Sequence, residues 1–155
     1  MTAATAPLSG SRSAAVLIDP RGPRFGAAIS SALLAAIVLL GARPAGLALL
    51  ALAVGLFAIG SMRGAQGTPQ GIAFRRWVQP RLGRPEHLED ARPPRFAQAV
   101  GLVVTATGLA LGLLGVGPAV TIAAGVALVA AFHNAALGFC LGCEIYLLIR
   151  RLRAA

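Results

Sequence analysis

Four long apolar stretches run through this chain and restrict the folds that it can adopt. They cover residues 24–41, 45–62, 96–115 and 118–138. A helix that crosses the hydrocarbon core of a bilayer needs about 17–25 predominantly apolar residues, so each stretch is long enough. Charged residues make up only 12% of the 155 residues, whereas soluble domains carry about 25%. The sequence therefore predicts an all-α integral membrane protein with four transmembrane helices.

Short joints group these helices into two hairpins. Residues 42–44 connect the first pair and residues 115–118 connect the second pair, while a segment rich in arginine and proline, residues 63–95, separates the hairpins. We expect residues 1–17, which are rich in Ala, Ser and Thr, to be disordered. Residues 18–155 are expected to form a single membrane domain that includes interfacial amphipathic helices.

The positive charge of the chain indicates how the helices are oriented. All fourteen basic residues are arginine, and only Arg43 lies in a joint between two helices of one hairpin. Because the number of spans is even, the termini and the central segment share one face, and the positive-inside rule assigns that face to the cytoplasm. The sequence thus predicts a multi-pass protein of the bacterial cytoplasmic (inner) membrane with both termini in the cytoplasm. Absence of lysine is typical of a GC-rich bacterial genome.

Nucleic-acid binding is not expected, although the formal net charge is +9. A basic protein that binds nucleic acid gathers its cations into a patch. Here the arginines lie at the ends of apolar segments, where membrane topology places them. Membrane lipid is therefore the expected partner of this charge.

A heptapeptide occurs twice and predicts an internal repeat. Residues 19–25 and 90–96 both read Asp-x-Arg-x-Pro-Arg-Phe and are 71 residues apart. We interpret the chain as a duplicated two-helix unit, with repeat one at 19–83 and repeat two at 90–153. Because each unit contains an even number of spans, the two would be parallel repeats related by an axis along the membrane normal.

The charged residues of this heptapeptide are candidates for anchoring or binding. Asp19 and Asp90 precede helix N-termini, where a carboxylate caps free N–H groups or pairs with an arginine. The arginines are expected near the lipid headgroups, where they would anchor the helices, bind lipid phosphate or hold an anionic ligand between the two copies. These candidate anion- or lipid-binding residues are Arg21, Arg24, Arg92 and Arg95.

Gly108 and Gly112 have the small-xxx-small spacing that lets helices approach closely in lipid. We expect this pair to serve packing within the chain. A contact between copies in a homo-oligomer is the alternative.

The two cysteines of the chain, Cys140 and Cys143, form a Cys-x-x-Cys motif after the fourth apolar stretch. In such a motif one thiolate attacks a disulfide and the other resolves the mixed disulfide. A helix that restarts after Gly138 would place Cys140 at its N-terminus, which lowers the pKa of a thiol. We therefore expect Cys140 to be the attacking thiol and Cys143 the resolving one.

His133 and Glu144 are candidate proton carriers beside these thiols. If the fourth helix continued past Gly138, His133, Cys140 and Glu144 would share one stripe of its surface. The same residues offer N, S and O ligands to zinc, but the usual second ligand pair is missing and no metal is expected. Small apolar cysteines that merely pack a helix end are a further alternative. Nothing in the sequence indicates a cofactor.

The motifs together resemble a known family. They are the first heptapeptide, the Pro-Arg-Leu-Gly-x-Pro-x-x-Leu-Glu-Asp run at 80–90, and Asn-Ala-Ala-Leu-Gly-Phe-Cys-Leu-Gly-Cys-Glu-Ile-Tyr at 134–146. The chain resembles the bacterial domain-of-unknown-function family 4395. This resemblance implies an integral membrane protein without an established activity. Members are often encoded near thioredoxin-like and rhodanese-like proteins, which makes a protein of either kind a candidate partner.

We expect a membrane protein whose cytoplasm-side Cys-x-x-Cys exchanges disulfides or sulfane sulfur with a soluble partner. A transporter for a small sulfur compound and a structural membrane subunit are the alternatives. Whether the chain is an enzyme stays open at the level of the sequence.

Overall fold

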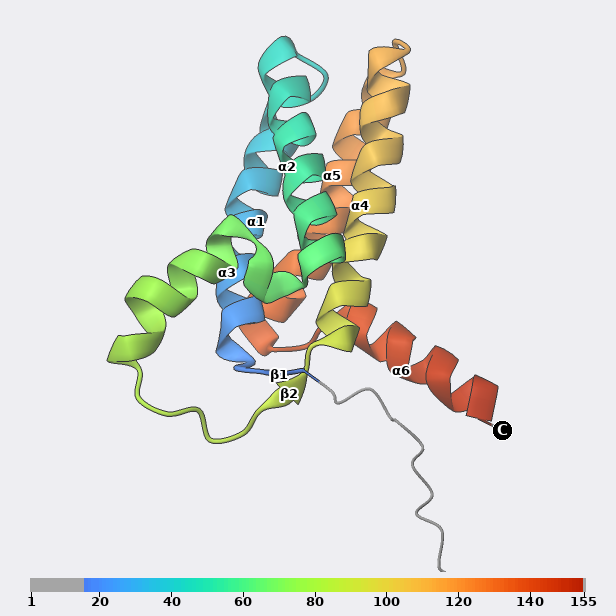
Figure 1. Ribbon diagram of the computed structural model, residues 1–155. Helices are drawn as coiled ribbons and strands as arrows, with labels where there is room; N and C mark the ends of the chain where they lie inside the picture. The colour runs from blue at the N-terminus through green and yellow to red at the C-terminus, as the bar shows by residue number, and fades with distance from the viewer. Residues whose placement is uncertain (1–15, 155) are drawn as a thin grey trace, which may run out of the picture.

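The computed structural model describes residues 16–154, and four long helices form its body. They are α1 (Arg21–Leu40), α2 (Pro44–Arg63), α4 (Arg92–Leu113) and α5 (Gly117–Leu137). The helices stand side by side as a bundle (Figure 1). All four are long and apolar enough to cross a membrane. This confirms the predicted all-α fold with four candidate spans, and it is compatible with a multi-pass membrane protein.

The shorter elements gather around the lower end of the bundle in Figure 1. Between α2 and α4 the chain forms a series of short helices. These are η1 (Ala65–Gly67), α3 (Pro69–Ala73), η2 (Phe74–Val78) and η3 (Gln79–Arg81). After α5, helix α6 (Leu141–Ala154) leaves the bundle at the same end and carries the C-terminus away from it.

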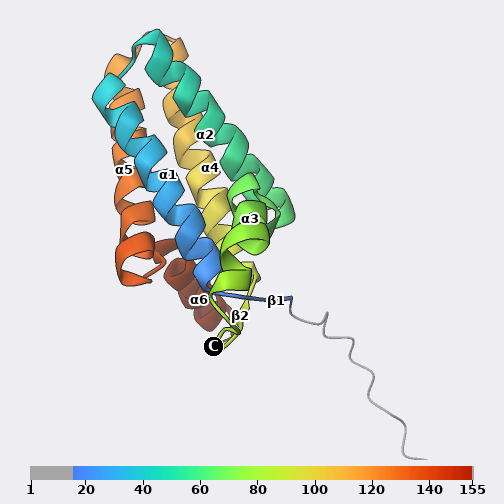
Figure 2. The same ribbon diagram turned by 90° about the vertical axis from the view of Figure 1, so that its left-hand side faces the viewer.

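The two hairpins pack across each other as well as within themselves. Helix α1 packs most extensively against α5, and α2 against α4, as Figure 2 shows from the side. Leu34, Ile37, Leu50 and Val120 form the fully buried centre of the core. Only 11–22% of each candidate span is buried inside the protein. Most of the apolar surface therefore points outward, as expected for helices whose solvent is lipid.

Gly108 lets α4 and α5 approach closely. A Cβ atom at Gly108 would collide with Ala123, and one at Gly112 would collide with Val120. Both glycines of the small-xxx-small pair thus serve packing within this chain, as expected from the sequence.

A two-residue ribbon joins the start of the two hairpins. Strand β1 (Leu17–Ile18) pairs antiparallel with β2 (Glu89–Asp90), with Leu17 opposite Asp90. Just before β1, the carbonyl oxygen of Val16 accepts the N–H of Ala91 at 2.9 Å. Val16 and Leu17 belong to the segment expected to be disordered, so the prediction is wrong for these two residues, whose backbone groups pair with the second half. Residues 1–15 lie outside the described part of the chain.

Candidate functional site

The site begins with a break in the helix at Gly138, one of the two possibilities that the sequence left open. Helix α5 ends at Leu137, and Gly138 adopts a left-handed conformation with φ of 69° while its N–H still reaches the carbonyl oxygen of Asn134 at 3.1 Å. Glycine suits this position because it has no Cβ to clash at positive φ. The chain turns away and α6 starts at Leu141. A new helix N-terminus therefore forms at the Cys-x-x-Cys motif.

Cys140 occupies the position just before the first residue of α6. Its Sγ accepts the N–H of Cys143 at 3.3 Å, and its carbonyl oxygen accepts the N–H of Glu144 at 3.0 Å. The sulfur thus takes the place of the oxygen of an N-cap side chain. Free N–H groups and the helix dipole favour negative charge at this point. When the pair is reduced, a thiolate at Cys140 would be stabilised by the start of α6.

The two cysteines are joined in the structure as a disulfide, with their Cα atoms 5.1 Å apart. Both residues are only partly buried. The structure therefore holds the oxidised form of a half-buried cysteine pair at the end of the bundle.

The packing of α6 against the start of α4 fixes the motif in place. A Cβ atom at Gly142 would lie only 2.6 Å from the Cβ of Ala97, so the glycine between the cysteines allows the two helices to touch. Four residues later, the ring of Tyr146 packs on Phe96 with centroids 5.6 Å apart. These two contacts dock the first two turns of α6 on α4.

His133 is not drawn into this arrangement. It lies in α5, and its Nδ1 is 2.7 Å from the carbonyl oxygen of Val129 in the same helix. A shared stripe of His133, Cys140 and Glu144 was expected only if the helix continued, and this condition is not met because α5 ends before Gly138. Glu144 lies in the first turn of α6 with an exposed side chain. Within residues 16–154, no group of three or more His, Cys, Asp or Glu side chains could hold a metal ion.

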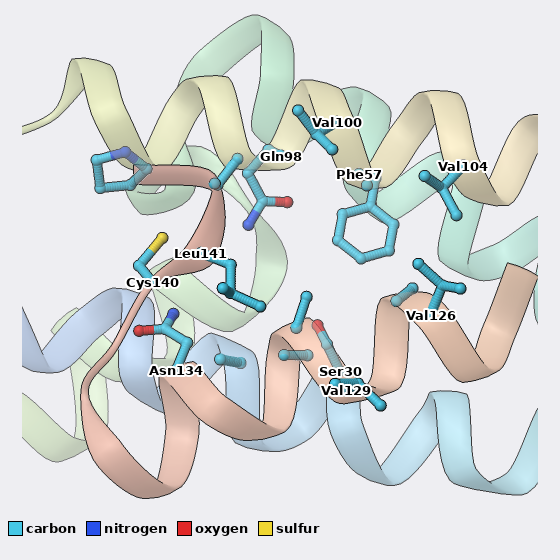
Figure 3. A pocket seen from close by; sticks show the side chains of 18 of the residues that line it. Ser30, Phe57, Gln98, Val100, Val104, Val126, Val129, Asn134, Cys140 and Leu141 are labelled. Carbon is cyan, nitrogen blue, oxygen red and sulfur yellow. The ribbon is translucent and has the colours of Figure 1, made fainter. Parts of the chain in front are cut away.

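A cavity of about 630 Å³ opens beside Cys140. Helices α1, α2, α4 and α5 contribute to its walls, and the start of α6 closes one end. In Figure 3, Cys140, Asn134 and Gln98 lie toward one end of the cavity, while Phe57 and Val126 lie toward the other. Cys140 thus borders a space that has two amides at one end and mainly apolar side chains, together with Ser30, along the rest.

A known protein family matches the part of the chain that contains these motifs. The family described as Domain of unknown function (DUF4395) matches residues 18–151, nearly the whole chain. The chain belongs to this family. This confirms the resemblance seen in the motifs. No curated protein and no solved structure matches the chain.

In the DUF4395 chain, two of the candidate anion-binding arginines cap helices of the opposite hairpin. Arg95 at the start of α4 donates from Nε to the carbonyl oxygen of Ser61 in α2 at 2.7 Å. Arg24 in α1 donates to the carbonyl oxygen of Ala135 in α5 at 3.5 Å. Cations are favourable at helix C-termini, where carbonyl groups lack partners. The structure therefore gives both side chains a structural role, and binding of lipid or another anion stays a prediction.

Arg21 and Arg92 pair with the aspartates of their own heptapeptides. Arg21 donates from Nε and Nη2 to the carboxylate oxygens of Asp19, with the shortest contact at 2.8 Å. Its Nη1 also donates to the carbonyl oxygen of Leu82, and its Nη2 to that of Gly83. The hydrogen bonds from Arg21 hold the pKa of Asp19 below its usual range. Arg92 lies 3.7 Å from Asp90. In each copy the aspartate also accepts the backbone N–H of its arginine at 2.9 Å.

Sequence reasoning missed the cavity and Gln98. A glutamine inside an apolar stretch was a usable signal, because a polar side chain in a span needs a partner or a function. The cavity itself left no local signal, because its walls come from five helices.

Proposed function

We propose that this chain is a protein of the bacterial inner membrane that exchanges disulfides with a soluble thiol protein through Cys140 and Cys143. The observation that carries the proposal is the N-cap position of Cys140, whose Sγ receives the N–H of Cys143 at 3.3 Å. A thiolate is the species that attacks and leaves in disulfide exchange. A site that stabilises it at one cysteine, with a second cysteine at bonding distance, is suited to that reaction.

The exchange is balanced between the two proteins. A thiolate of the partner attacks the Cys140–Cys143 disulfide, forms a mixed disulfide with one sulfur and releases the other as a thiolate that takes up a proton. A second thiol of the partner then attacks the mixed disulfide. The partner leaves as a disulfide, and Cys140 and Cys143 become a dithiol that has gained two electrons and two protons. In the reverse direction, Cys140 attacks and Cys143 resolves.

Sulfane-sulfur transfer uses the same geometry. The Cys140 thiolate would accept the outer sulfur of a partner's persulfide, and the partner would leave as a thiolate. Sulfane-sulfur transfer fits a rhodanese-like partner, whereas disulfide exchange fits a thioredoxin-like partner. The exposed Glu144 at the start of α6 stays a candidate for moving the protons, while His133 gains no support because its ring is bonded within α5.

The cytoplasmic placement of the motif is supported by the arginines. Helix α6 and the segment between the hairpins carry ten of them, and both lie at the end where the described chain begins and ends. Arg43, in contrast, precedes α2 at the opposite end. Under the positive-inside rule the arginine-rich end, with Cys140 and Cys143, faces the cytoplasm.

Exchange with a purified thioredoxin tests the proposal. Reduced thioredoxin is mixed with the oxidised protein in detergent, and the thiols of Cys140 and Cys143 are counted by mass-tag alkylation after acid quenching. We expect two tags per chain, and none when thioredoxin carries serines in place of its cysteines. Failure of thioredoxin and of a rhodanese persulfide alike to modify either cysteine would contradict the proposal.

A further inference from the structure

The cavity beside Cys140 is lined in part by exposed apolar side chains of the candidate membrane spans. Val100, Val126 and Val129 line it and are exposed residues of α4 and α5, with Val126 55% exposed. These residues lie within candidate membrane spans. A molecule dissolved in the bilayer could therefore enter from the side, and the volume of about 630 Å³ is within the usual range for small-molecule sites.

Two amide side chains give the cavity a polar end. Gln98 and Asn134 line it together with Cys140 (Figure 3). Gly60 makes room for Gln98, because a Cβ atom there would lie 2.6 Å from the glutamine Oε1. Across residues 16–154, the structure shows no hydrogen bond from either amide side chain to another residue. Both amides are therefore free to bind a ligand. Because an unpaired polar group within a span is costly, a ligand that forms hydrogen bonds with them would be favoured here.

We propose that this cavity binds a lipid-soluble quinone that oxidises the Cys140–Cys143 dithiol. The inference rests on the proposed thiol exchange and names the acceptor of its electrons. The dithiol loses two electrons and two protons and forms the S–S bond. The quinone takes up both and leaves as the hydroquinol, while its carbonyl oxygens accept hydrogen bonds from the amides of Gln98 and Asn134. The disulfide is thereby regenerated for the next soluble partner.

The form of the cavity favours a quinone over a plain lipid chain. A quinone combines a polar redox head with an apolar tail. The cavity combines Cys140 and two amides at one end with mainly apolar side chains, such as Phe57 and the valines, and Ser30 along the rest. An acyl chain would fill the apolar part and leave both amides without a partner. A water-soluble oxidant would not need a cavity lined by exposed apolar side chains of the spans.

Oxidation by decylubiquinone tests this inference. The purified protein is reduced chemically, the reductant is removed, and loss of thiols is followed together with loss of quinone absorbance. We expect one quinone consumed for each pair of thiols. Val126→Trp, which fills the apolar side of the cavity, should slow this oxidation by about tenfold or more. Val129→Trp provides the same obstruction if the first variant does not fold.

The matched control is Val103→Trp. Val103 is 66% exposed on α4 and does not line the cavity, so this variant should keep the wild-type rate. Diamide, a water-soluble oxidant, should oxidise all variants at the same rate. The inference is overturned if decylubiquinone leaves the thiols intact, or if the cavity variants and Val103→Trp react alike. In a thermal unfolding assay, we expect decylubiquinone to raise the unfolding midpoint of the protein more than didecanoyl phospholipid does. Equal increases from the two compounds would also overturn the inference.

The two proposals fail in different ways. If decylubiquinone leaves the dithiol intact but thioredoxin still exchanges with the disulfide, only the quinone site is rejected. If neither thioredoxin nor a persulfide donor reacts while the quinone does, the soluble partner is rejected.

Discussion

At Cys140 a single conformational choice decides the local chemistry. Gly138 takes a φ of 69°, which ends α5, and two residues later the Sγ of Cys140 receives an N–H from the first turn of α6. Had the helix continued, both cysteines would lie inside a helix whose N–H groups are already bonded. The helix restart is therefore what supports different roles for the two thiols.

Asp19 shows how a carboxylate at the start of α1 stabilises the fold. Its side chain is 5% exposed and receives hydrogen bonds from Arg21 and from Gln79. The Arg21 hydrogen bonds lower the pKa of Asp19 in the folded protein. The stabilisation is therefore present above the pKa of the unfolded chain and is lost as the pH falls through the folded-state pKa.

Asp19→Asn should lower stability by about 1 kcal/mol at neutral pH. This is less than the usual contribution of a hydrogen bond to a charged group, because water screens the partly exposed Arg21. The difference from wild type should shrink in acid. Unfolding midpoints in detergent across a pH series would measure both effects. Asp90→Asn is the matched control, because Asp90 is more exposed, at 32% for its side chain, and a smaller change is expected. Equal losses in both variants would contradict this account.

At the scale of elements, the docking of α6 on α4 sets the position of the motif. Gly142 lies between the two cysteines and contacts Ala97, and Tyr146 packs on Phe96. The first hairpin has a related contact, in which Phe25 of α1 packs on Phe74 with ring centroids 5.7 Å apart. Phe25 and Phe96 are equivalent under the 71-residue offset. The internal repeat stays a prediction, and this pair of contacts agrees with it.

Gly142→Ala should displace α6 from α4, since the added methyl group would lie 2.6 Å from the Cβ of Ala97. Overpacking of this kind costs about 1–3 kcal/mol. We expect faster proteolysis within α6 and faster alkylation of the reduced cysteines. Gly125→Ala is the control, because nothing lies within 4 Å of a Cβ at that position. If Gly142→Ala behaves like Gly125→Ala in both assays, the contact does not hold the motif.

For the molecule as a whole, the four helices were predictable and the site was only partly so. Hydropathy averaged over about twenty residues is a local property, so the spans followed from the sequence. Helix α1 begins at Arg21, three residues before the expected start, because Pro23 suits a first helical turn. The break at Gly138 needed a backbone conformation that spacing alone does not specify. The cavity needed side chains from five helices, such as Gln98 and Phe57, to be placed together.

Membrane topology can be checked with thiol labelling. In inverted vesicles, whose cytoplasmic face points outward, a membrane-impermeant maleimide should label Cys140 and Cys143 after reduction. A single cysteine introduced at Arg43, in a variant with both native cysteines replaced by serine, should label only in right-side-out vesicles, because Arg43 lies at the opposite end. Labelling of Cys140 and Cys143 only from the periplasmic side would contradict the cytoplasmic placement.

The most direct measurement is the capture of a mixed disulfide in the cell that makes this protein. Cys143→Ser removes the resolving thiol, so Cys140 should remain linked to the soluble protein with which it exchanges. Purification without reductant, followed by mass spectrometry, should identify a thioredoxin-like or rhodanese-like protein bound through its reactive cysteine and released by dithiothreitol. Cys140→Ser, its matched control, should capture much less. Absence of any such adduct, or equal adducts from both variants, would contradict the proposed exchange at Cys140.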